Sequence, residues 1–498
     1  MKKILSDKKI IIMILSIILV LVVMSSTTYA LFFKVHTMDN TESYTAGILD
    51  IKVEEGSKLE LVNSLPITDE EGANLTPYTF TITNVGNLTY TFDLKLLSTT
   101  TENQINPNYI KIKLDDKPVL LSSLSEGLIA EDLTLNPEES ITMSIRIWLS
   151  IDTPNTEIGK TFSAKIVTDG VGSEYIPAQS TLNKLGLTVN KGTPNFMKTA
   201  QESCSDEGAC ETTNGIYEIY DDLGTSYYFR GEVENNYVKF AGFYWRIIRI
   251  NGDGTIRIIY DGTSAHVNGE ATFDKYVDTS NFNDEYNNNA YAGYMYGNIE
   301  GNTYEDVHAN IYDSTIKKVV DKWYKINIED KGYNDYVTDA IYCNDRSVYS
   351  GTGIGTSTTY YMPRFRIYNQ KNPSLVCKQE NDKFTVSDDL GNGDLTYPVG
   401  LITVDEVSLA GGVYSVDNTK YYLYTGGHYR TISPNSFYDS GIWMWRVVHT
   451  GALGGSFAGT STNTYGVRPV ISLNKNTKFI GNGTMDSPFE VVSWKKDT

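Results

Sequence analysis

The sequence predicts a multidomain fold: an N-terminal all-β sandwich, Ig-like or jelly-roll-like, followed by an α+β domain. The chain has 498 residues, and at about 150 residues per domain this length allows about three domains. Hydrophobic residues make up 40% and charged residues 21%, which is enough apolar content for packed cores. Apolar and polar residues alternate through the first third of the chain, whereas a clear helical spacing occurs only later.

The balance of charge excludes one class of partner. Asp and Glu total 61 while Lys and Arg total 42, which gives a formal net charge of −19. A protein that binds phosphate backbones needs a basic surface, so no nucleic-acid partner is expected. The five histidines show no HxH or HExxH spacing, and no serine stands in a G-x-S-x-G elbow. The sequence therefore predicts no metal site, no cofactor and no serine hydrolase.

The N-terminus has the build of a secretory signal peptide. Within residues 1–30, four lysines precede the apolar run Ile10–Met24, and a small-residue cleavage site ends at Ala30. An uncleaved anchor is the alternative, because Leu31–Phe33 extends the apolar stretch toward the ~20 residues of a full span. Both interpretations export the rest of the chain. We therefore expect an extracellular or cell-surface location, with membrane contact only through this segment.

Residues 31–172 are predicted to form the β-sandwich. The clearest alternating run contains Ile141, Met143, Ile145, Ile147 and Leu149. Similar runs begin at Ile48, Phe80, Tyr90, Ile110 and Phe162. Turn sequences such as Asn106–Asn108 separate the runs. Short alternating strands at this spacing, without a helical stretch, are typical of a sandwich.

Two motifs of this segment resemble a known family. Ser43–Ile51 has the sequence SYTAGILDI, and Phe80–Leu88 has the sequence FTITNVGNL. They are similar to the TAGxLDL start and the F-x-(V/I)-x-N-x-G strand of the TasA/camelysin class of secreted biofilm-matrix proteins of Gram-positive bacteria. The chain departs from that class at His36–Asp39, where the class has an F-x-D step. It also lacks a clear PGD turn before Phe80.

The resemblance implies a matrix protein that assembles by exchange of an N-terminal strand. In physical terms, an exposed strand at Leu31–His36 could complete the open sheet edge of a neighbouring copy. The alternative is that this strand pairs within its own sandwich, and the residues leave both possibilities open. Self-association through Leu31–His36 is therefore one expectation for this chain.

Residues 173–212 mix Gly, Pro, Ser, Thr and Asn with few large apolar groups, which indicates a linker. Cys204 and Cys210 lie in this linker with five residues between them, so a local disulfide is expected. Cys343 and Cys377 would then close a longer loop. Export permits disulfides, although four cysteines allow three pairings. Their spacing fits no usual zinc pattern.

The second domain is expected at residues 213–475, which leaves 476–498 as a C-terminal tail. Phe243–Tyr260 predicts a β-hairpin around the turn Asn251–Gly254. Further along, apolar residues at i, i+3, i+4 and i+7 from Ile316 predict the best helix in the chain, capped by Asp313 or Ser314.

Two later segments of this domain are predicted to be strands. Tyr397–Thr403 has the composition of a buried strand that leads into a short helix, and Val467–Leu473 has that of a closing strand. Asp405 and Glu406 stand at the start of the short helix. Adjacent acids in a first turn favour helix capping over general acid–base catalysis.

Several runs between residues 213 and 492 resemble uncharacterised surface proteins of gut Firmicutes and their relatives. Among them are SYYFRG at 226–231, CNDRS at 343–347 and GVRPV at 466–470. The layout is similar to the C-type-lectin-like fold shared with formylglycine-generating enzymes, which implies a C-type-lectin-like α+β domain with an exposed late loop face. The resemblance does not carry over enzyme activity, because neither cysteine of this domain lies in the late region where that chemistry would be expected.

The late aromatic-rich segments supply the candidate binding residues. Rigid aromatic side chains beside Arg suit recognition of a protein or a glycan. The alternative is that they pack in the core, especially two tryptophans on one strand face. The candidates are Tyr424, His428, Tyr429, Arg430, Trp443, Trp445 and Arg446.

The sequence thus predicts an exported bacterial cell-surface or extracellular-matrix protein. Its first domain would position or polymerise the molecule, and its second would bind a ligand in adhesion without being an enzyme. The alternatives are an enzyme or enzyme-derived domain on the formylglycine-generating-enzyme fold, and a pure fibre subunit. A cleft with converging titratable groups would favour the enzyme, whereas a shallow aromatic face would favour binding.

Overall fold

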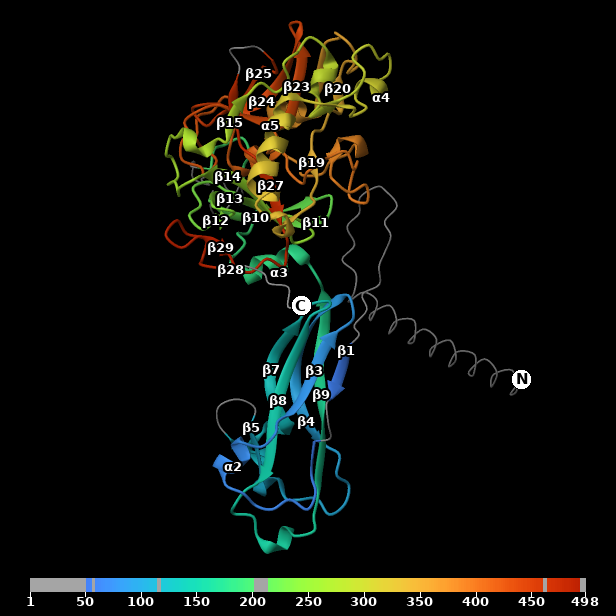
Figure 1. The fold of residues 1–498 in the computed structure, drawn as a ribbon, viewed down its shortest axis with the longest axis vertical. Helices are drawn as coiled ribbons and strands as arrows, with labels where there is room; N and C mark the ends of the chain where they lie inside the picture. The colour runs from blue at the N-terminus through green and yellow to red at the C-terminus, as the bar shows by residue number, and fades with distance from the viewer. Residues whose placement is uncertain (1–50, 56–58, 114–117, 201–213, 460–463, 493–498) are drawn as a thin grey trace, which may run out of the picture. The chain divides into compact units, whose positions relative to one another are not determined.

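The computed structural model describes residues 51–55, 59–113, 118–200, 214–459 and 464–492. The chain divides into two compact units, of which one ends at Tyr175 and the other begins at Ile176 (Figure 1). Both are rich in β-strands, which confirms a multidomain, β-rich protein. Within the described residues no helix is long and apolar enough to cross a membrane. The predicted leader, its cleavage site at Ala30 and the strand Leu31–His36 lie outside the described residues.

The first unit is built from two antiparallel sheets. One sheet has, in spatial order, β1 (Ile51–Glu55), β3 (Tyr78–Asn84), β8 (Ser140–Leu149), β5 (Ile110–Lys113) and β6 (Val119–Leu120). The other has β2 (Leu59–Leu61), β9 (Phe162–Glu174), β4 (Leu88–Ser98) and β7 (Leu128–Leu135). Side chains from both sheets share one core, in which Phe80 and Ile145 meet Phe92 and Leu94. The alternating pattern of the sequence supplies these inward faces.

Asn84 connects the two sheets of this unit. It ends β3 with a fully buried side chain, whose Nδ2 donates to the backbone oxygens of Leu88 at 2.7 Å and Leu135 at 2.9 Å. Its Oδ1 accepts from the backbone N–H of Gly86 at 3.1 Å. Because Leu88 and Leu135 belong to the other sheet, this amide satisfies backbone groups at the sandwich edge. The N-x-G part of the strand motif thus has a structural role.

The first unit also contains a helix that the alternating pattern did not predict. α2 (Asp69–Ala73) is one short turn. Thr68 and Glu71 form a reciprocal capping box, with Thr68 N–H donating to Glu71 Oε2 at 2.9 Å. Local capping therefore overrides the β pattern between β2 and β3.

The second unit contains two large sheets. The first follows the order β18 (Val337–Thr338), β27 (Val470–Leu473), β14 (Ile256–Gly262), β13 (Phe243–Ile250), β12 (Tyr237–Phe240), β29 (Phe489–Val491) and β28 (Phe479–Ile480). A branch of this sheet is formed by β10 (Gly215–Asp221) and β11 (Gly224–Arg230), which pair with each other, and β11 also pairs with β13. The second follows the order β15 (Asp278–Ser280), β26 (Tyr465–Val467), β23 (Tyr429–Tyr438), β21 (Thr359–Tyr361) and β20 (Val348–Ser350), with β24 (Gly441–Val447) between β23 and β25 (Leu453–Phe457).

Smaller elements complete the second unit as described. The two-stranded sheets are β16 (Met295–Tyr296) with β17 (Tyr312–Asp313), and β19 (Tyr342–Cys343) with β22 (Lys383–Phe384). The helices are α3 (Pro177–Lys184), α4 (Tyr304–Val307), α5 (Thr315–Tyr324), α6 (Met362–Arg364) and α7 (Val404–Ala410). One large core collects side chains from both sheets and from α3, α5 and α7.

The predicted hairpin and helix are confirmed. β13 and β14 pair antiparallel, and the tight turn at Asn251–Gly254 includes Gly254 at φ 87°. Ser314 caps α5, because its hydroxyl accepts from the backbone N–H of Lys317 at 3.3 Å. The short helix at Asp405 is confirmed as α7. Thr403 caps α7 in a capping box with Glu406, so the capping role of Glu406 is confirmed too.

Two predicted strands differ in the structure. Tyr397–Thr403 is not a strand but an irregular segment, buried from Val399 onward, with a single bridge between Gly400 and Val470. It cannot extend that pairing, because β27 already pairs with β14 and β18. The predicted closing strand is two strands, since Arg468–Pro469 separates β26 in one large sheet from β27 in the other. This segment therefore links the two sheets.

The unit boundary also differs from the predicted linker and tail. α3, within the predicted linker, contributes Ala178 and Leu182 to the core of the second unit, and Thr181 donates to Gly254 O at 2.6 Å. β28 and β29, within the predicted tail, join the first large sheet through a parallel pairing with β12. The apolar residues of these segments are too sparse in the sequence to indicate a core element. In the structure they are buried by partners that are distant in the chain.

The disulfide Cys343–Cys377 is present and is confirmed. It closes a loop across a sequence separation of 34 residues. The predicted bond between Cys204 and Cys210 lies outside the described residues.

Candidate ligand-binding groove

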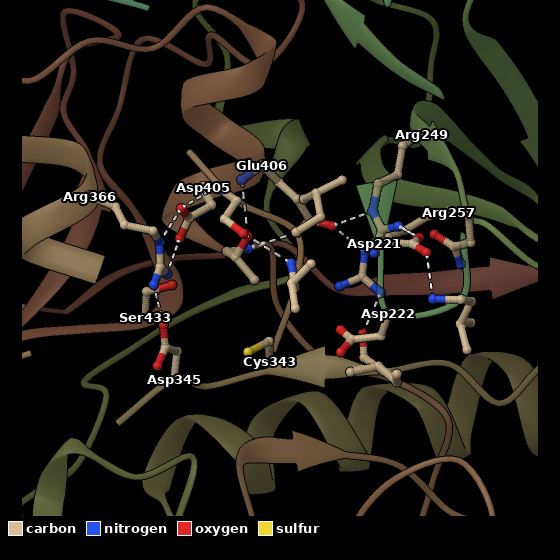
Figure 2. Close-up of a pocket in the computed structure, with 17 residues that line it drawn as sticks. Asp221, Asp222, Arg249, Arg257, Cys343, Asp345, Arg366, Asp405, Glu406 and Ser433 are labelled. Atoms are coloured by element: carbon tan, nitrogen blue, oxygen red, sulfur yellow. Dashed lines mark hydrogen bonds and ion pairs between the residues drawn. The ribbon is translucent and has the colours of Figure 1, made fainter. Parts of the chain in front are cut away.

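Charged side chains converge at one buried place in the second unit (Figure 2). Arg249 lies between two carboxylates, with Nη1 2.5 Å from Asp221 Oδ2 and Nε 3.1 Å from Glu406 Oε1. The Nε of Arg257 lies 2.6 Å from the same Glu406 oxygen. Burial opposes ionisation of Glu406, but Arg257 and Arg249 outweigh it and lower its pKa. Glu406 is therefore a carboxylate bridging two arginines.

Asp405, the neighbour of Glu406 on α7, pairs with a different arginine. Arg366 donates from Nε and Nη2 to the two Asp405 oxygens at 2.8 Å each, and its Nη1 lies 2.6 Å from Asp345 Oδ2. Burial lowers the pKa of Arg366, but Asp405 and Asp345 outweigh it and raise the pKa. Figure 2 shows this cluster on the other side of Glu406 from Arg249. Successive residues of one helix thus anchor two separate ion-pair clusters.

The cavity among these groups is too small for a substrate. Its volume is about 30 Å³, which is room for about two water molecules. The carboxylates of Asp221, Asp345, Asp405 and Glu406 are each bound to arginine. This convergence of titratable residues therefore stabilises the fold and has no room for chemistry on a ligand.

A larger hollow lies on the second large sheet. Its volume is about 390 Å³, within the range of small-ligand sites. Strands β21, β23, β24 and β25, helix α6 and the segment that follows α7 supply its walls. We call it the aromatic groove, and it is lined by Tyr360, Arg364, Tyr414, Asn435, Ser436, Tyr438, Trp443 and Gly455.

Trp443 provides the flat wall of the aromatic groove. Its indole packs on Phe457 with ring centroids 4.3 Å apart, and its Nε1–H donates to Tyr438 O at 3.2 Å. Tyr438 is 54% exposed at the same end. The indole is thus fixed from behind while its surface stays partly open. Such a rigid amphipathic ring suits stacking against a flat ligand face.

Gly455 keeps the floor of the groove open. A Cβ at this position would lie 3.4 Å from Asn435 Nδ2 and 3.5 Å from the Trp443 ring. Its partner across β24–β25 is Trp445. A larger side chain at residue 455 would therefore project between the aromatic wall and the polar residues.

Arg364 supplies the positive charge of the groove. Its guanidinium lies over the rings of Tyr360 and Tyr368, at 5.1 Å and 4.8 Å from their centroids. Its Nη1 donates to Asn435 Oδ1 at 3.1 Å. Asn435 is 3% exposed, and its Nδ2 has no hydrogen-bond partner within the described residues. The groove thus combines stacking surfaces with a guanidinium and a free amide donor.

The structure separates the seven residues predicted for binding. Trp443 lines the groove, whereas Trp445 is fully buried behind Tyr414, with ring centroids 5.8 Å apart. Tyr429 is buried and donates its hydroxyl to Leu423 O at 3.1 Å. Tyr424 is partly buried, with its carbonyl accepting from Lys275 Nζ at 3.1 Å. The remaining three residues gather elsewhere, around Tyr465: His428, Arg430 and Arg446.

Sequence reasoning missed most of the groove. Tyr360 and Arg364 come from the strand and helix some 80 residues before Trp443, and only the tertiary fold brings them there. Tyr438 had a local signal in the sequence, the dipeptide Asp439–Ser440 that follows it. In the structure these two residues form a two-residue turn with φ of 53° and 62°. That turn places Tyr438 and Gly441 opposite one another, with Trp443 two residues further along the returning strand.

Comparisons with known proteins give little further guidance. No family model matches the chain, and no curated protein matches it. Among solved structures, the chain is similar to the sporulation control protein Spo0M from Bacillus subtilis at 12% sequence identity. The match covers 42% of this chain and 77% of that one, with a TM-score of 0.12. A likeness at this level carries no argument about fold or function.

Proposed function

We propose that this protein is an exported bacterial surface or matrix protein whose second unit binds carbohydrate in the aromatic groove. The observation that carries the proposal is the groove itself, with Trp443 as its flat wall and Arg364 and Asn435 beside it. A sugar ring offers an apolar face for stacking and hydroxyls around its edge. An indole, a guanidinium and an amide match those two features.

Two further observations support export. The N-terminal sequence has the build of a signal peptide or anchor, and Cys343 and Cys377 are joined in a disulfide. Structural disulfides persist mainly in oxidising compartments. A location outside the cytoplasm, free or tethered by the N-terminal segment, follows as part of the proposal.

The finer fold assignments belong to the same proposal. We infer a C-type-lectin-like domain for the second unit and a TasA/camelysin-like sandwich for the first, on the sequence resemblances given above. Asn84 supports the TasA/camelysin-like assignment of the first unit, since this residue of the motif has a defined role between the two sheets. Self-association would use Leu31–His36 at a sheet edge such as β1, the end strand of its sheet among the described strands.

Binding is favoured over catalysis by the contrast between the two hollows. The place where titratable groups converge has room for about two waters, and its carboxylates are bound to arginines. The aromatic groove is lined by aromatic, amide and hydroxyl side chains with one cation. It contains no pair of carboxylates for acid–base hydrolysis of a glycoside.

The test is calorimetric titration of the full chain with tetrasaccharides built from glucose, xylose or N-acetylglucosamine. We expect saturable binding of at least one, and a loss of tenfold or more in affinity in Trp443→Ala. Phe273→Ala is the matched control, because Phe273 is 76% exposed and outside the groove. Absence of binding to the whole panel, or equal affinity in wild type and Trp443→Ala, would refute the proposal.

A further inference from the structure

The residues that line the aromatic groove include a cation but no carboxylate. Arg364 is the cation, and none of the lining residues is Asp or Glu. A second cation lies beside the groove, because Lys371 Nζ lies 5.6 Å from the ring centroid of Tyr414 and 5.7 Å from that of Tyr368. Neither Arg364 nor Lys371 forms an ion pair within the described residues. The groove is therefore locally positive, although the whole chain has a net charge of −19.

Arg364 keeps hydrogen-bond donors for a ligand. Its Nη1 donates to Asn435 Oδ1 at 3.1 Å. No hydrogen bond within the described residues uses its Nε or Nη2, and neither nitrogen is buried away from solvent. A guanidinium has five N–H donors in a planar fork, which matches the two oxygens of a carboxylate. Arg364 can therefore bind a carboxylate while it holds Asn435.

Asn435 adds a second donor on the same side of the groove. Its side chain is 3% exposed, and its Oδ1 also accepts from the Ser436 hydroxyl at 3.0 Å. Because a guanidinium can only donate, the Asn435 atom that contacts Arg364 is the oxygen, and Nδ2 is the free end of the amide. Nδ2 faces the groove floor, where a Cβ on Gly455 would lie 3.4 Å from it. A buried amide thus points its N–H groups into the groove.

This pair of donors favours an anionic acceptor. The hydroxyl of a neutral sugar can accept from Arg364 or from Asn435, but a carboxylate accepts through charge-assisted hydrogen bonds, which are about twice as strong as neutral ones. A uronic acid carries its carboxylate at the edge of the sugar ring and keeps the ring face that can stack on Trp443. It therefore matches the donors and the flat wall of the groove together.

We propose that the aromatic groove selects carbohydrate that contains uronic acid, with the carboxylate bound by Arg364 and Asn435 and the sugar ring on Trp443. The inference rests on the proposed carbohydrate binding and names its substrate class. The net charge of −19 repels an anion at long range, so a preference for the acidic sugar has to come from groups within the groove.

The test is calorimetric titration of the full chain with a β-1,4-linked glucuronate tetrasaccharide and with its methyl ester, at one ionic strength. Both have the same rings and linkage, and only the first is charged. We expect the wild type to bind the uronate at least about tenfold more tightly than the ester. Arg364→Gln should bring the two affinities within about threefold of each other. Trp443→Ala should weaken both ligands and leave the preference, because stacking serves both.

Two further variants make the test specific. Lys318→Gln is the matched control, because it removes the same charge from an exposed position on α5 outside the groove and should keep the preference. Asn435→Asp keeps the shape of asparagine but replaces its free N–H donors with a carboxylate that can pair with Arg364. This variant should therefore also lose the preference for the uronate.

Each outcome decides between the two proposals. Equal binding of uronate and ester by wild type, or tighter binding of the ester, overturns the uronic-acid inference and leaves carbohydrate binding in place. An undiminished preference in folded Arg364→Gln or in folded Asn435→Asp also overturns the inference. If the uronate, the ester and the neutral tetrasaccharides all fail to bind, the proposed function fails with it.

Discussion

Arg364 donates a hydrogen bond of 3.1 Å to Asn435, although 70 residues separate them in the chain. The bond joins α6 to β23 and fixes a cation and an amide on one side of the aromatic groove. Arg364 also lies over the rings of Tyr360 and Tyr368. The groove is therefore preorganised, which reduces the entropy lost when a ligand binds.

Arg364→Gln should weaken carbohydrate binding about 5- to 20-fold, because it removes both the ring contacts and a charged donor. Arg364→Lys should not restore the affinity, since an ammonium lacks the planar fork that stacks on tyrosine. Calorimetric titration measures both variants. A wild-type affinity in Arg364→Gln would mean that the ligand does not reach this side of the groove.

Glu406→Gln should destabilise the second unit strongly. It leaves Arg249 and Arg257 buried with their shared counter-charge removed, and such a loss costs about 3–5 kcal/mol. Asp330→Asn is the matched control, because its pair with Lys325 is about half exposed and should leave the urea midpoint unchanged. Urea unfolding followed by fluorescence measures both. Equal midpoints for the two variants would contradict the structural role of Glu406.

Acid should destabilise the second unit through its histidines. Burial, then Arg446 and His449, lower the pKa of His428 to about 4, and burial and Arg346 lower that of His308 well below 6.5. Between pH 6.5 and 4 the unfolded chain therefore binds a proton at His428 that the folded chain does not, so stability falls as pH falls.

His428→Asn should reduce this acid sensitivity, because asparagine can still accept from His449 N–H but does not titrate. His428 is partly exposed, so screening limits the expected gain between pH 7 and 5 to about 1 kcal/mol relative to wild type. Urea unfolding at the two pH values gives the difference. The same loss of stability in both proteins would show that His428 titrates normally.

Removing the disulfide should lower stability without changing the groove. Its loop spans 34 residues, for which the loss of unfolded-chain constraint costs about 4 kcal/mol. The double variant Cys343→Ala/Cys377→Ala should therefore unfold at a lower temperature but bind carbohydrate as wild type. Calorimetry measures both properties. A loss of binding in the folded double variant would show that the disulfide also shapes the groove.

Local signals made part of this fold predictable. The β13–β14 hairpin has its turn residues in sequence, and α5 has both a cap and an apolar stripe. Arg468 and Pro469, by contrast, divide one apparent strand between two sheets. The local sequence pattern does not distinguish one continuous strand from two strands in different sheets, because the partner strands come from elsewhere in the chain.

The tryptophans show why the site was only partly predictable. Period-two spacing places Trp443 and Trp445 on one face, and the structure agrees. Burial then separates them, because Tyr414 covers Trp445 while Trp443 lines the groove. The covering residue lies about 30 positions earlier in the chain, so a single strand could not reveal which tryptophan was available.

The most direct measurement of the carbohydrate-binding proposal is titration of Gly455→Leu with the tetrasaccharide that binds wild type best. Leucine would project into the groove without contacting the ion-pair clusters, so the protein should fold and binding should be abolished. Gly455→Ala is the control, since its methyl meets only ordinary contacts at 3.4–3.5 Å and should change affinity less than threefold. Undiminished binding by folded Gly455→Leu would contradict the assignment of the aromatic groove as the binding site.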